Sequence, residues 1–521
     1  MFTQPSEADS SPGSKSAEFF GPHARTILIC ILFVCGFWLR LDGIADPPLR
    51  FHGTRQFRSA LIARAYYYGM IDTVSQEKKR AATVSAEKEG VLEPPIMEWL
   101  AAIAYRLGGA ERLWLPRLMS ALFWLVGGVF VYLIALRLMS PGSGVFAAAF
   151  YIFLPYGIDA SRSFQPDPLM VMLFLGGVLL TLNYFDAPSV RRLALAIVVA
   201  AAAMFIKPVC LFPMYTAFLA LAVLAHGVRR ALTRKDVWVY CGGSLVPTIL
   251  YYIYGIFIGG FLGGQARASF MPRLWGKLSY WEGWLDRLEF VLGSPAILAA
   301  LVSVLLARPG RQRTVLSALW IGYACYGLVF NYHIHTHDYY HLPFIPIAAL
   351  SLLPLFDLAL RRLSELYGAW LARGGAVALM IVGICLSLYQ ADWRVPRTRA
   401  AEIVEVARAV GASVGHSDKT VFLAHHYGKP LQYYGEIAGV NWPDRTELRA
   451  RRLRGRPQLT ARQRLDRIST NHPIEFFIVT NLRDFARQRD LNEFLHGEFP
   501  LLVQDQNFLI FDLRGYAGDT D

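Results

Sequence analysis

Charged residues are scarce in this sequence. Asp, Glu, Lys and Arg make up 17% of its 521 residues, whereas hydrophobic residues make up 54%. A soluble globular protein carries about 25% charged residues. The composition therefore excludes an ordinary soluble protein and predicts a mainly α-helical, polytopic membrane protein.

Cysteine and nucleotide-binding motifs are also rare or missing. The six cysteines all fall in apolar runs without metal-ligand spacing, so we interpret them as small buried core residues. The sequence has no P-loop, dinucleotide fingerprint, nucleophile elbow or zinc-peptidase motif, which argues against a nucleotide-driven pump. Lys and Arg outnumber Asp and Glu, and the net charge is +13. We attribute this excess to cytoplasmic loops and anionic lipid rather than to nucleic acid.

Long apolar runs predict about eleven transmembrane helices. The first, residues 26–39, lacks a small-residue cleavage site and is interpreted as an uncleaved signal anchor. The others lie near residues 113–136, 144–158, 168–185, 193–206, 209–225, 237–263, 293–307, 314–331, 342–360 and 373–389. If the N-terminus is cytoplasmic, the connections rich in Lys and Arg all fall on the cytoplasmic side. Loops 42–113 and 264–291 and the C-terminus are then expected outside.

The chain divides into three predicted domains. Residues 1–24 are rich in Ser, Gly, Pro and Glu and are expected to form a disordered cytoplasmic tail. Residues 25–391 form the transmembrane domain. Residues 392–521 form a small extracytoplasmic α/β domain, with strands at 421–424, 476–480 and 508–513 and helices at 399–410 and 484–495.

The external loop 42–113 is too polar to lie within lipid. Apolar residues recur at helical spacing at Phe57, Leu61, Ala65 and Tyr68, which predicts an amphipathic helix at the membrane surface. A second short helix is expected to begin at Pro94-Pro95 and to end at Gly108-Gly109. The two helices indicate a lid or floor for a lipid-borne substrate.

Asp167 lies between two prolines directly before an apolar run. Burial near the membrane boundary would raise the pKa of this carboxyl and a nearby Arg162 would lower it, which suits a general base. Alternatively, Asp167 only begins the next helix, because acidic residues favour helix N-termini. Arg162 and Gln165 nearby favour the functional interpretation.

Residues 331–341 contain four histidines and one aspartate. These side chains could bind a divalent metal, but the alternating pattern gives no fixed tetrahedral geometry. We favour hydrogen bonding of His335, His337, Asp338, Tyr339 and Tyr340 to sugar hydroxyls or phosphate. A metal site and an interfacial aromatic belt remain alternatives.

Several cations on the external side depart from the positive-inside trend. They are Arg55, Arg58, Arg64, Arg117, Arg162 and Lys207. Arginine forks match phosphate oxygens, so together these residues indicate phosphate binding, whereas each alone would suit a snorkelling interfacial residue. The basic run 445–467 is interpreted as solvated helix faces, with contact to anionic lipid or an acidic polysaccharide as the alternative.

These motifs, in this order, resemble the GT-C membrane glycosyltransferases, specifically the protein O-mannosyltransferase and aminoarabinose transferase superfamily. The resemblance covers roughly residues 25–390. It rests on Glu93-Pro94-Pro95, Tyr105-Arg106-Leu107-Gly108, Leu115-Pro116-Arg117-Leu118, Arg162 with Pro166-Asp167, Lys207-Pro208 and His337-Asp338-Tyr339-Tyr340. Residues 52–64 resemble a bacterial branch with a His-x-x-Arg-Gln pattern in the first loop.

The resemblance implies a GT-C-like fold in the cytoplasmic (inner) membrane, with the active site facing the periplasm or exterior. It implies transfer of one sugar, with inversion, from a polyprenyl phosphate donor to a hydroxyl of an envelope lipid, glycan or protein. Membrane lipids are the other expected partners, and no nucleotide sugar or nucleic acid is involved.

The resemblance also implies roles for individual residues. The family's first loop carries an acidic residue near residues 52–56, where this sequence has none, so Asp167 or His52 is expected to act as base, and Asp167 is preferred. Expected substrate-binding residues are Arg55, Gln56, Arg58, Glu93, Arg117, Arg162, Lys207, His335, His337, Asp338, Tyr339 and Tyr340.

Two functions from other classes also fit a polytopic membrane protein. A lipid or glycan transporter or flippase would place charges near the membrane midplane and would often contain paired broken helices. Here the polar clusters gather on one face and no internal repeat is evident. A non-catalytic envelope assembly subunit is the other alternative, and such a subunit should tolerate substitution of Asp167.

Overall fold

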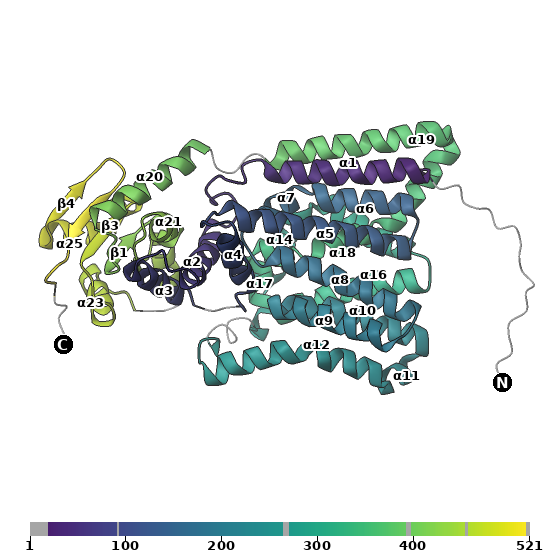
Figure 1. Cartoon of the computed structure of the whole chain (residues 1–521), viewed down its shortest axis with the longest axis horizontal. Coiled ribbons are helices and arrows are strands. Elements are labelled where there is room, and N and C mark those ends of the chain that lie inside the picture. Colours follow the sequence, from purple (N-terminus) through teal and green to yellow (C-terminus); the bar gives the residue numbers. More distant parts are fainter. Residues whose placement is uncertain (1–18, 91–92, 264–269, 392–396, 454–456, 517–521) are drawn as a thin grey trace, which may run out of the picture.

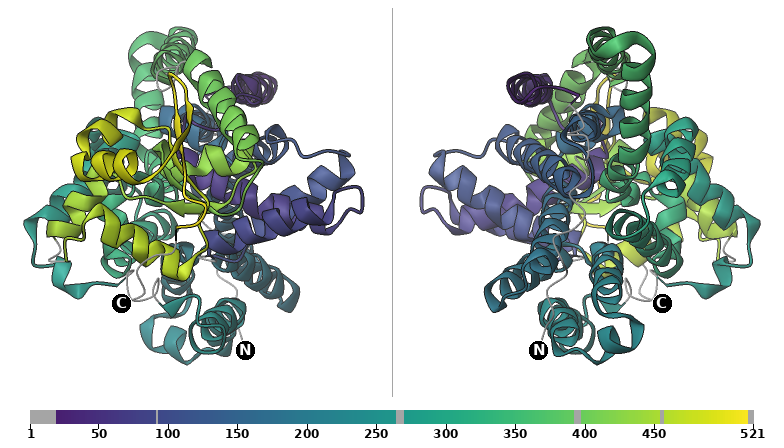
Figure 2. Two further views of the ribbon diagram at one scale, coloured as in Figure 1. Left: turned by 90° about the vertical axis from the view of Figure 1, so that its left-hand side faces the viewer. Right: turned by 90° about the vertical axis from the view of Figure 1, so that its right-hand side faces the viewer.

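The computed structural model describes residues 19–90, 93–263, 270–391, 397–453 and 457–516. Most of the predicted tail 1–24 therefore lies outside the described residues. A bundle of long helices occupies the middle of the molecule, and the C-terminal domain lies at one end of it (Figure 1). Viewed along the bundle, that domain lies across its end (Figure 2).

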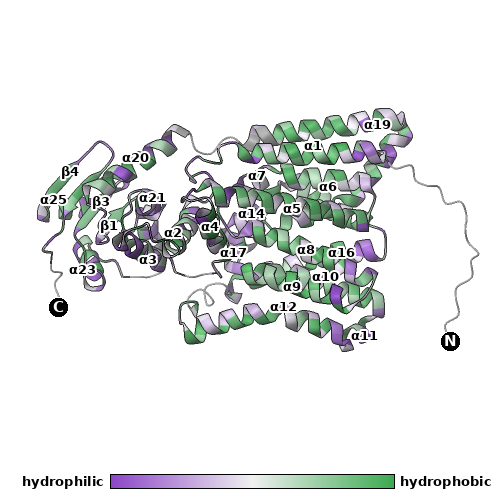
Figure 3. Ribbon diagram, in the orientation of Figure 1, coloured by the Kyte–Doolittle hydropathy of each residue, from purple (hydrophilic) through white to green (hydrophobic). Residues whose placement is uncertain are grey.

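The bundle is built from apolar helices that run roughly side by side (Figure 1). They are α1 (Pro22–Leu41), α5 (Trp114–Leu138), α6 (Pro141–Phe153), α7 (Pro155–Ser161), α8 (Asp167–Asp186), α9 (Val190–Ile206), α10 (Leu211–His226), α12 (Lys235–Ile253), α15 (Ser294–Leu306), α16 (Arg311–Val329), α18 (Phe344–Ser351) and α19 (Leu353–Ala391). Hydrophobic residues predominate along these helices (Figure 3). The predicted mainly α, multi-pass membrane class is confirmed.

The number of membrane crossings stays a prediction. Among the described residues, six helical segments are long and apolar enough to span a membrane, and two pairs bent by 60° and 95° would raise the number to eight. Each of the eleven predicted apolar runs falls on helices of the bundle. The last two runs share α19, which bends at Gly368, where φ is 76°.

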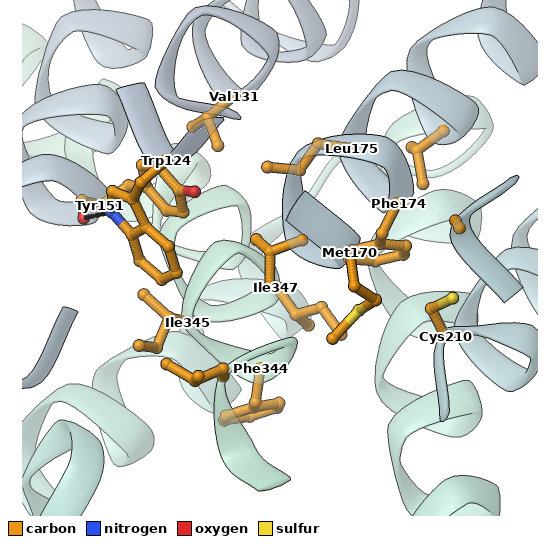
Figure 4. Close-up of a cluster of buried hydrophobic side chains, with 14 of the residues drawn as sticks. Trp124, Val131, Tyr151, Met170, Phe174, Leu175, Cys210, Phe344, Ile345 and Ile347 are labelled. Atoms are coloured by element: carbon orange, nitrogen blue, oxygen red, sulfur yellow. Dashed lines mark hydrogen bonds between the residues drawn. The ribbon is translucent and has the colours of Figure 1, made fainter. Parts of the chain in front are cut away.

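The bundle core is packed from several helices that are distant in sequence. The Trp124 ring of α5 stacks on Tyr151 of α6 with centroids 4.6 Å apart, and Met170, Phe174 and Ile347 lie in the same region (Figure 4). Such close packing fixes the helices relative to one another. One end of the bundle therefore presents a rigid platform toward residues 42–113, the loop that is predicted to be external.

The external loop contains three helices rather than two. The predicted helices are α2 (Gly53–Gly69) and α4 (Ile96–Leu107), and α3 (Gln76–Glu89) lies between them. The backbone N–H of Lys78 donates to the Ser75 side chain and so caps α3. The segment 264–291 is also not a simple loop, because residues Leu278–Leu292 form helix α14. Its residues 264–269 lie outside the described residues.

The C-terminal domain contains a five-stranded sheet in the order β2-β1-β3-β5-β4. Its strands are β1 (Thr420–Leu423), β2 (Gly439–Asn441), β3 (Phe476–Val479), β4 (Leu501–Gln504) and β5 (Leu509–Asp512), and its helices are α20 (Arg397–Ser413), α21 (Lys429–Tyr434), α22 (Arg445–Leu453), α23 (Ala461–Asn471), α24 (Leu482–Arg487) and α25 (Arg489–Glu498). β1 runs parallel to β2 and β3, and β5 runs antiparallel to β3 and β4. Continuous apolar β1 and β3 suit strands that are buried on both faces.

The C-terminal domain is held against α2 by a charged cluster. Nη1 of Arg64 donates to the Tyr433 carbonyl at 2.8 Å, and Nε of Arg64 donates to Glu111 at 3.0 Å. The Tyr433 hydroxyl donates to the same Glu111 carboxylate at 2.6 Å. Lys429 and Glu89 form a second ion pair. These contacts attach the domain to the external loop rather than to the lipid-facing helices.

Candidate active site

A cavity of about 620 Å³ lies where the external loop meets the bundle. It is lined by Arg55 and Arg58 of α2, by Glu93 before α4, by Lys207 after α9, and by His333, His337, Tyr339 and Tyr340 before α18. These segments are far apart in sequence. The cavity therefore exists only because the loop helices fold back over the ends of the bundle.

Four charged groups meet at the polar end of this cavity. The Lys207 ammonium donates to Oδ1 of Asp167 at 2.7 Å and lies 3.7 Å from Oε1 of Glu93. Arg55 Nη2 lies 3.6 Å from Oδ2 of Asp167 and 3.7 Å from Oε2 of Glu93. Asp167 and Lys207 are almost completely buried. The pairing with two cations permits a buried carboxylate that would otherwise be strongly disfavoured.

Local backbone signals place Asp167 and Lys207. Asp167 occupies the first turn of α8 between Pro166 and Pro168, where a negative charge interacts favourably with the helix N-terminus. Lys207 caps the C-terminus of α9 with an extended backbone, as expected for a residue that precedes proline. Two helix ends thus meet with opposite charges.

Two tyrosines cover the cations. The Arg55 guanidinium lies 4.0 Å from the centre of the Tyr339 ring. The Lys207 ammonium lies 4.3 Å from the centre of the Tyr340 ring. A cation over an aromatic face is stabilised by about 0.5–2 kcal/mol, more when water is excluded. The tyrosines therefore hold both cations at the cavity wall.

His52 lies beside this cluster and bonds to Asp338. Its Nε2 is 2.8 Å from Oδ1 of Asp338, and its ring packs edge-on against Phe51 and Tyr339. His52 has φ 45° and ψ 55°, a left-handed conformation that costs about 1–3 kcal/mol and is typical of functional sites. Burial acts to raise the pKa of Asp338, but the hydrogen bond and charge of His52 outweigh it and lower this pKa.

Three of the four histidines of residues 331–341 lie at or near the cavity, two in its lining and one outside it. His333 and His337 line the cavity, and burial together with the neighbouring cations lowers their pKa values to about 3 and about 4. His335 instead bonds to the Asn331 carbonyl and packs against Tyr280. Among the described residues, no three His, Cys, Asp or Glu side chains gather as a metal site.

Five predicted substrate-binding residues lie outside the cavity lining, and three of them, Arg117, Arg162 and Gln56, hold the loop in place. Arg117 donates to the carbonyls of Ile44, Asp46 and Arg162. Arg162 donates to Asp159 and to the Asp42 carbonyl. Buried Gln56 donates to the carbonyls of Pro48 and Phe51 and accepts from the Phe164 N–H. The sequence shows that these polar residues are present, but it does not show which backbone groups they bond to.

The rest of the cavity lining is largely apolar and was not predicted. It is formed by Thr248, Ile249 and Tyr252 of α12 and by Val209, Phe270, Val329, Phe330 and Tyr332. Except for Phe270 and Tyr332, these residues lie in apolar runs, where any one of them resembles an ordinary lipid-facing side chain. Only the tertiary structure shows that one cavity combines side chains that suit hydrocarbon with side chains that suit an anion.

The fold and part of the sequence match known proteins. Residues 92–254 match the family model described as dolichyl-phosphate-mannose-protein mannosyltransferase. ArnT from Cupriavidus metallidurans bound to undecaprenyl phosphate has a similar structure, with a TM-score of 0.59 and 13% identity over 94% of this chain and 98% of that chain. The chain has the fold of the GT-C membrane glycosyltransferases.

Two other solved GT-C structures are similar over most of this chain. The oligosaccharyltransferase of Archaeoglobus fulgidus in the apo form has a TM-score of 0.55 and 11% identity over 88% of this chain and 70% of that chain. The mycobacterial arabinofuranosyltransferase AftD has a TM-score of 0.53 and 15% identity over 95% of this chain and 40% of that chain. No curated protein sequence matches the chain significantly.

Proposed function

We propose that this GT-C-fold protein transfers one sugar from a polyprenyl phosphate donor to a hydroxyl of an envelope acceptor, with inversion. The observation that carries the proposal is a cavity whose lining combines the cations Arg55 and Lys207 with apolar side chains from α12 and α16. A lipid-linked phosphate combines an anion and a hydrocarbon tail in the same way. The likeness to ArnT bound to undecaprenyl phosphate supports this donor class.

Arg55 is the proposed principal phosphate ligand. Both of its carboxylate neighbours lie beyond 3.5 Å, so within the described part of the chain its guanidinium makes no short hydrogen bond. Its planar donors can therefore bind phosphate oxygens in a bidentate manner. Lys207, aligned by Asp167, adds a second positive charge. Together they stabilise the charge that grows on the leaving phosphate.

His52 is the proposed base. Its Nε2–H donates to Asp338, which leaves Nδ1 as the nitrogen that accepts a proton. In the proposed step, Nδ1 takes the proton of the acceptor hydroxyl, and the hydroxyl oxygen forms a bond to the anomeric carbon. The bond from that carbon to the phosphate oxygen breaks, and its electron pair stays on the phosphate. Asp338 orients the imidazole and stabilises its protonated form.

Asp167 was expected to be the preferred base, and we now assign it a positioning role. Its carboxylate is held between Lys207 and Arg55 and is only 1% exposed, whereas the His52 side chain is 31% exposed. A general base has to reach the proton that it removes. Asp167 thus aligns the two cations, whereas His52 keeps an exposed edge.

Sugar transfer from lipid donors tests this proposal. Purified protein is incubated with radiolabelled polyprenyl-phosphate sugars and extracted envelope glycans, beside parallel reactions with nucleotide sugars. We expect labelled glycan from at least one lipid donor, none from nucleotide sugars, and loss of product in Arg55→Met. Label from nucleotide sugars alone would refute the proposal. Movement of the lipid donor across the membrane of proteoliposomes, without any labelled glycan, would instead favour the flippase alternative.

The cellular arrangement belongs to the same proposal. We infer that the protein lies in the cytoplasmic membrane with the cavity and the C-terminal domain on the periplasmic or outer side. The loop helices α2 to α4 and the C-terminal sheet lie at one end of the bundle (Figure 1), as this topology requires. Membrane-impermeant labelling of a single cysteine introduced at exposed Arg106 of α4, in a variant without native cysteines, tests it in intact cells.

A further inference from the structure

A second cavity, of about 350 Å³, lies between the C-terminal domain and the first external loop. We call it the domain cavity and define it by its polar lining residues Arg399, Glu402, His425, His426, Thr480 and Asn507. Leu49 of the first loop also lines it. The domain cavity is therefore shared between the domain and the loop that carries the proposed base.

The domain cavity lies at the carboxyl ends of the parallel strands β1 and β3. His425 and His426 follow β1, and Thr480 follows β3. The chain leaves β1 toward β2 on one side, whereas β3 pairs with β1 on the other side. The crevice outside such a switch point is where open α/β sheets bind ligands. The topology thus singles out this cavity as a binding site.

The turn after β1 is held in an unusual conformation. His426, Tyr427 and Gly428 all have positive φ values, of 53°, 54° and 67°. A Cβ atom on Gly428 would lie 2.2 Å from the Phe422 ring, so only glycine fits. Residues in this region cost about 1–3 kcal/mol each and persist where the surrounding structure requires them. This turn fixes the two imidazoles at the cavity rim.

The chemistry of the lining suits sugar hydroxyls. Partial burial, together with the charge of Arg399, lowers the pKa of both His425 and His426, so both imidazoles are neutral at pH 7 and can donate and accept. In the described residues, neither imidazole has a protein hydrogen-bond partner. The Asn507 amide and the Thr480 hydroxyl also donate and accept. The charges of Arg399 and Glu402 cancel, so the cavity lining has no net positive charge that would attract an anion.

We propose that the domain cavity binds the saccharide portion of the acceptor and presents it to His52. A Cβ atom on Gly53, the residue after His52, would lie 3.8 Å from Nδ1 of His426, so the cavity rim adjoins the proposed base. Tyr339 lines the first cavity, which we call the donor cavity, and packs against the His52 ring. The assignment of this saccharide to the acceptor rests on the proposed function, whereas the binding of a saccharide does not.

Binding of neutral oligosaccharides to the full-length protein in nanodiscs, without donor, tests the site. The probes are di- to hexasaccharides of hexoses, N-acetylhexosamines, heptoses and pentoses, followed by saturation-transfer NMR. We expect at least one to bind, with its Kd raised about fivefold or more in His425→Ala and in Asn507→Ala. His472→Ala, at an exposed position on the same domain, and Arg106→Ala, at an exposed position of α4, should leave this Kd unchanged.

The outcomes separate this inference from the proposed function. No binding by any oligosaccharide, equal Kd values in all variants, or displacement of the saccharide by inorganic phosphate would overturn the saccharide site. Active transfer with an unchanged acceptor KM in His425→Ala would overturn it while the proposed function stands. Saccharide binding that follows the expected pattern, without transfer from any lipid donor, would support the site and refute the donor assignment.

Discussion

Nε2 of His52 lies 2.8 Å from Oδ1 of Asp338, and this hydrogen bond joins the N-terminus of α2 to the segment before α18. The proposed proton-transfer pair thus takes His52 from the first loop and Asp338 from the bundle. Because His52 is held in a left-handed conformation and packs against Tyr339, its ring has little freedom. The pair is the most direct target for substitution.

Replacing His52 should remove the base without removing the donor site. We expect His52→Ala to lower kcat about 10²- to 10⁴-fold, the usual contribution of general base catalysis. Asp338→Asn should lower kcat less, since the imidazole remains but loses its orienting carboxylate. Steady-state transfer assays measure both effects, with His472→Ala as the matched control. A kcat for His52→Ala within twofold of the unsubstituted protein would contradict the assignment.

Replacing Arg55 should weaken donor binding. A hydrogen bond to a charged group contributes about 1.5–3 kcal/mol, so Arg55→Met should raise the Kd for polyprenyl phosphate about 10- to 150-fold. Arg55→Lys should recover part of the affinity, because it keeps the charge but not the planar fork. Native mass spectrometry measures the bound fraction. Exposed Arg106→Met is the control, and equal losses in both variants would indicate a general effect of charge.

The Lys207–Asp167 pair should show strong thermodynamic coupling. Removing one partner leaves the other buried charge with only a more distant neighbour, Arg55 for Asp167 and Glu93 for Lys207, and breaking a buried pair in this way costs about 3–5 kcal/mol. Lys207→Met and Asp167→Leu should each lower Tm in detergent, whereas the double variant should be less destabilised than the sum of the two. Thermal unfolding of all four proteins completes the cycle. Additive effects would show that the 2.7 Å contact contributes little.

Glu98 of α4 should make stability depend on pH. Burial raises the pKa of this carboxyl, and the hydrogen bond from Ser59 at 2.7 Å opposes that effect only in part. A folded-state pKa above the unfolded value favours folding at low pH, and this contribution is lost as pH rises through the folded-state pKa.

Glu98→Gln removes the charged form and so should raise Tm relative to the unsubstituted protein at pH 8 more than at pH 4. Glu87→Gln, at an exposed position of α3, should show no such difference. A Tm difference for Glu98→Gln that is equal at both pH values would contradict the assigned cause.

Arg64 should control docking of the C-terminal domain. Arg64→Ala removes the donors to Glu111 and to the Tyr433 carbonyl, together with a cation–π contact at 3.9 Å. Loss of charged hydrogen bonds worth about 1.5–3 kcal/mol should increase domain opening at least about tenfold. Limited proteolysis measures the separation of the domain, and exposed Arg80→Ala is the control.

The helical elements were predicted where the sequence carries a clear period. Apolar residues at helical spacing gave α2 and α4, and continuous apolar runs gave β1 and β3. Helix α3 was missed because Gln76–Glu89 has no apolar stripe, so only its Ser75 cap marks it. β2 and β4 were missed because one is three residues long and the other is largely exposed.

The amino-acid sequence by itself determined the membrane class, the helices of the bundle and the collection of cations and histidines in the segments that meet at one end, because hydropathy and local backbone preferences are properties of short segments. Only the tertiary structure decided which of those groups meet. It brought Arg55, Lys207 and Tyr339 together and turned Arg117 and Arg162 toward backbone carbonyls of the first loop. Side-chain pairing depends on packing between distant segments, which no local pattern contains.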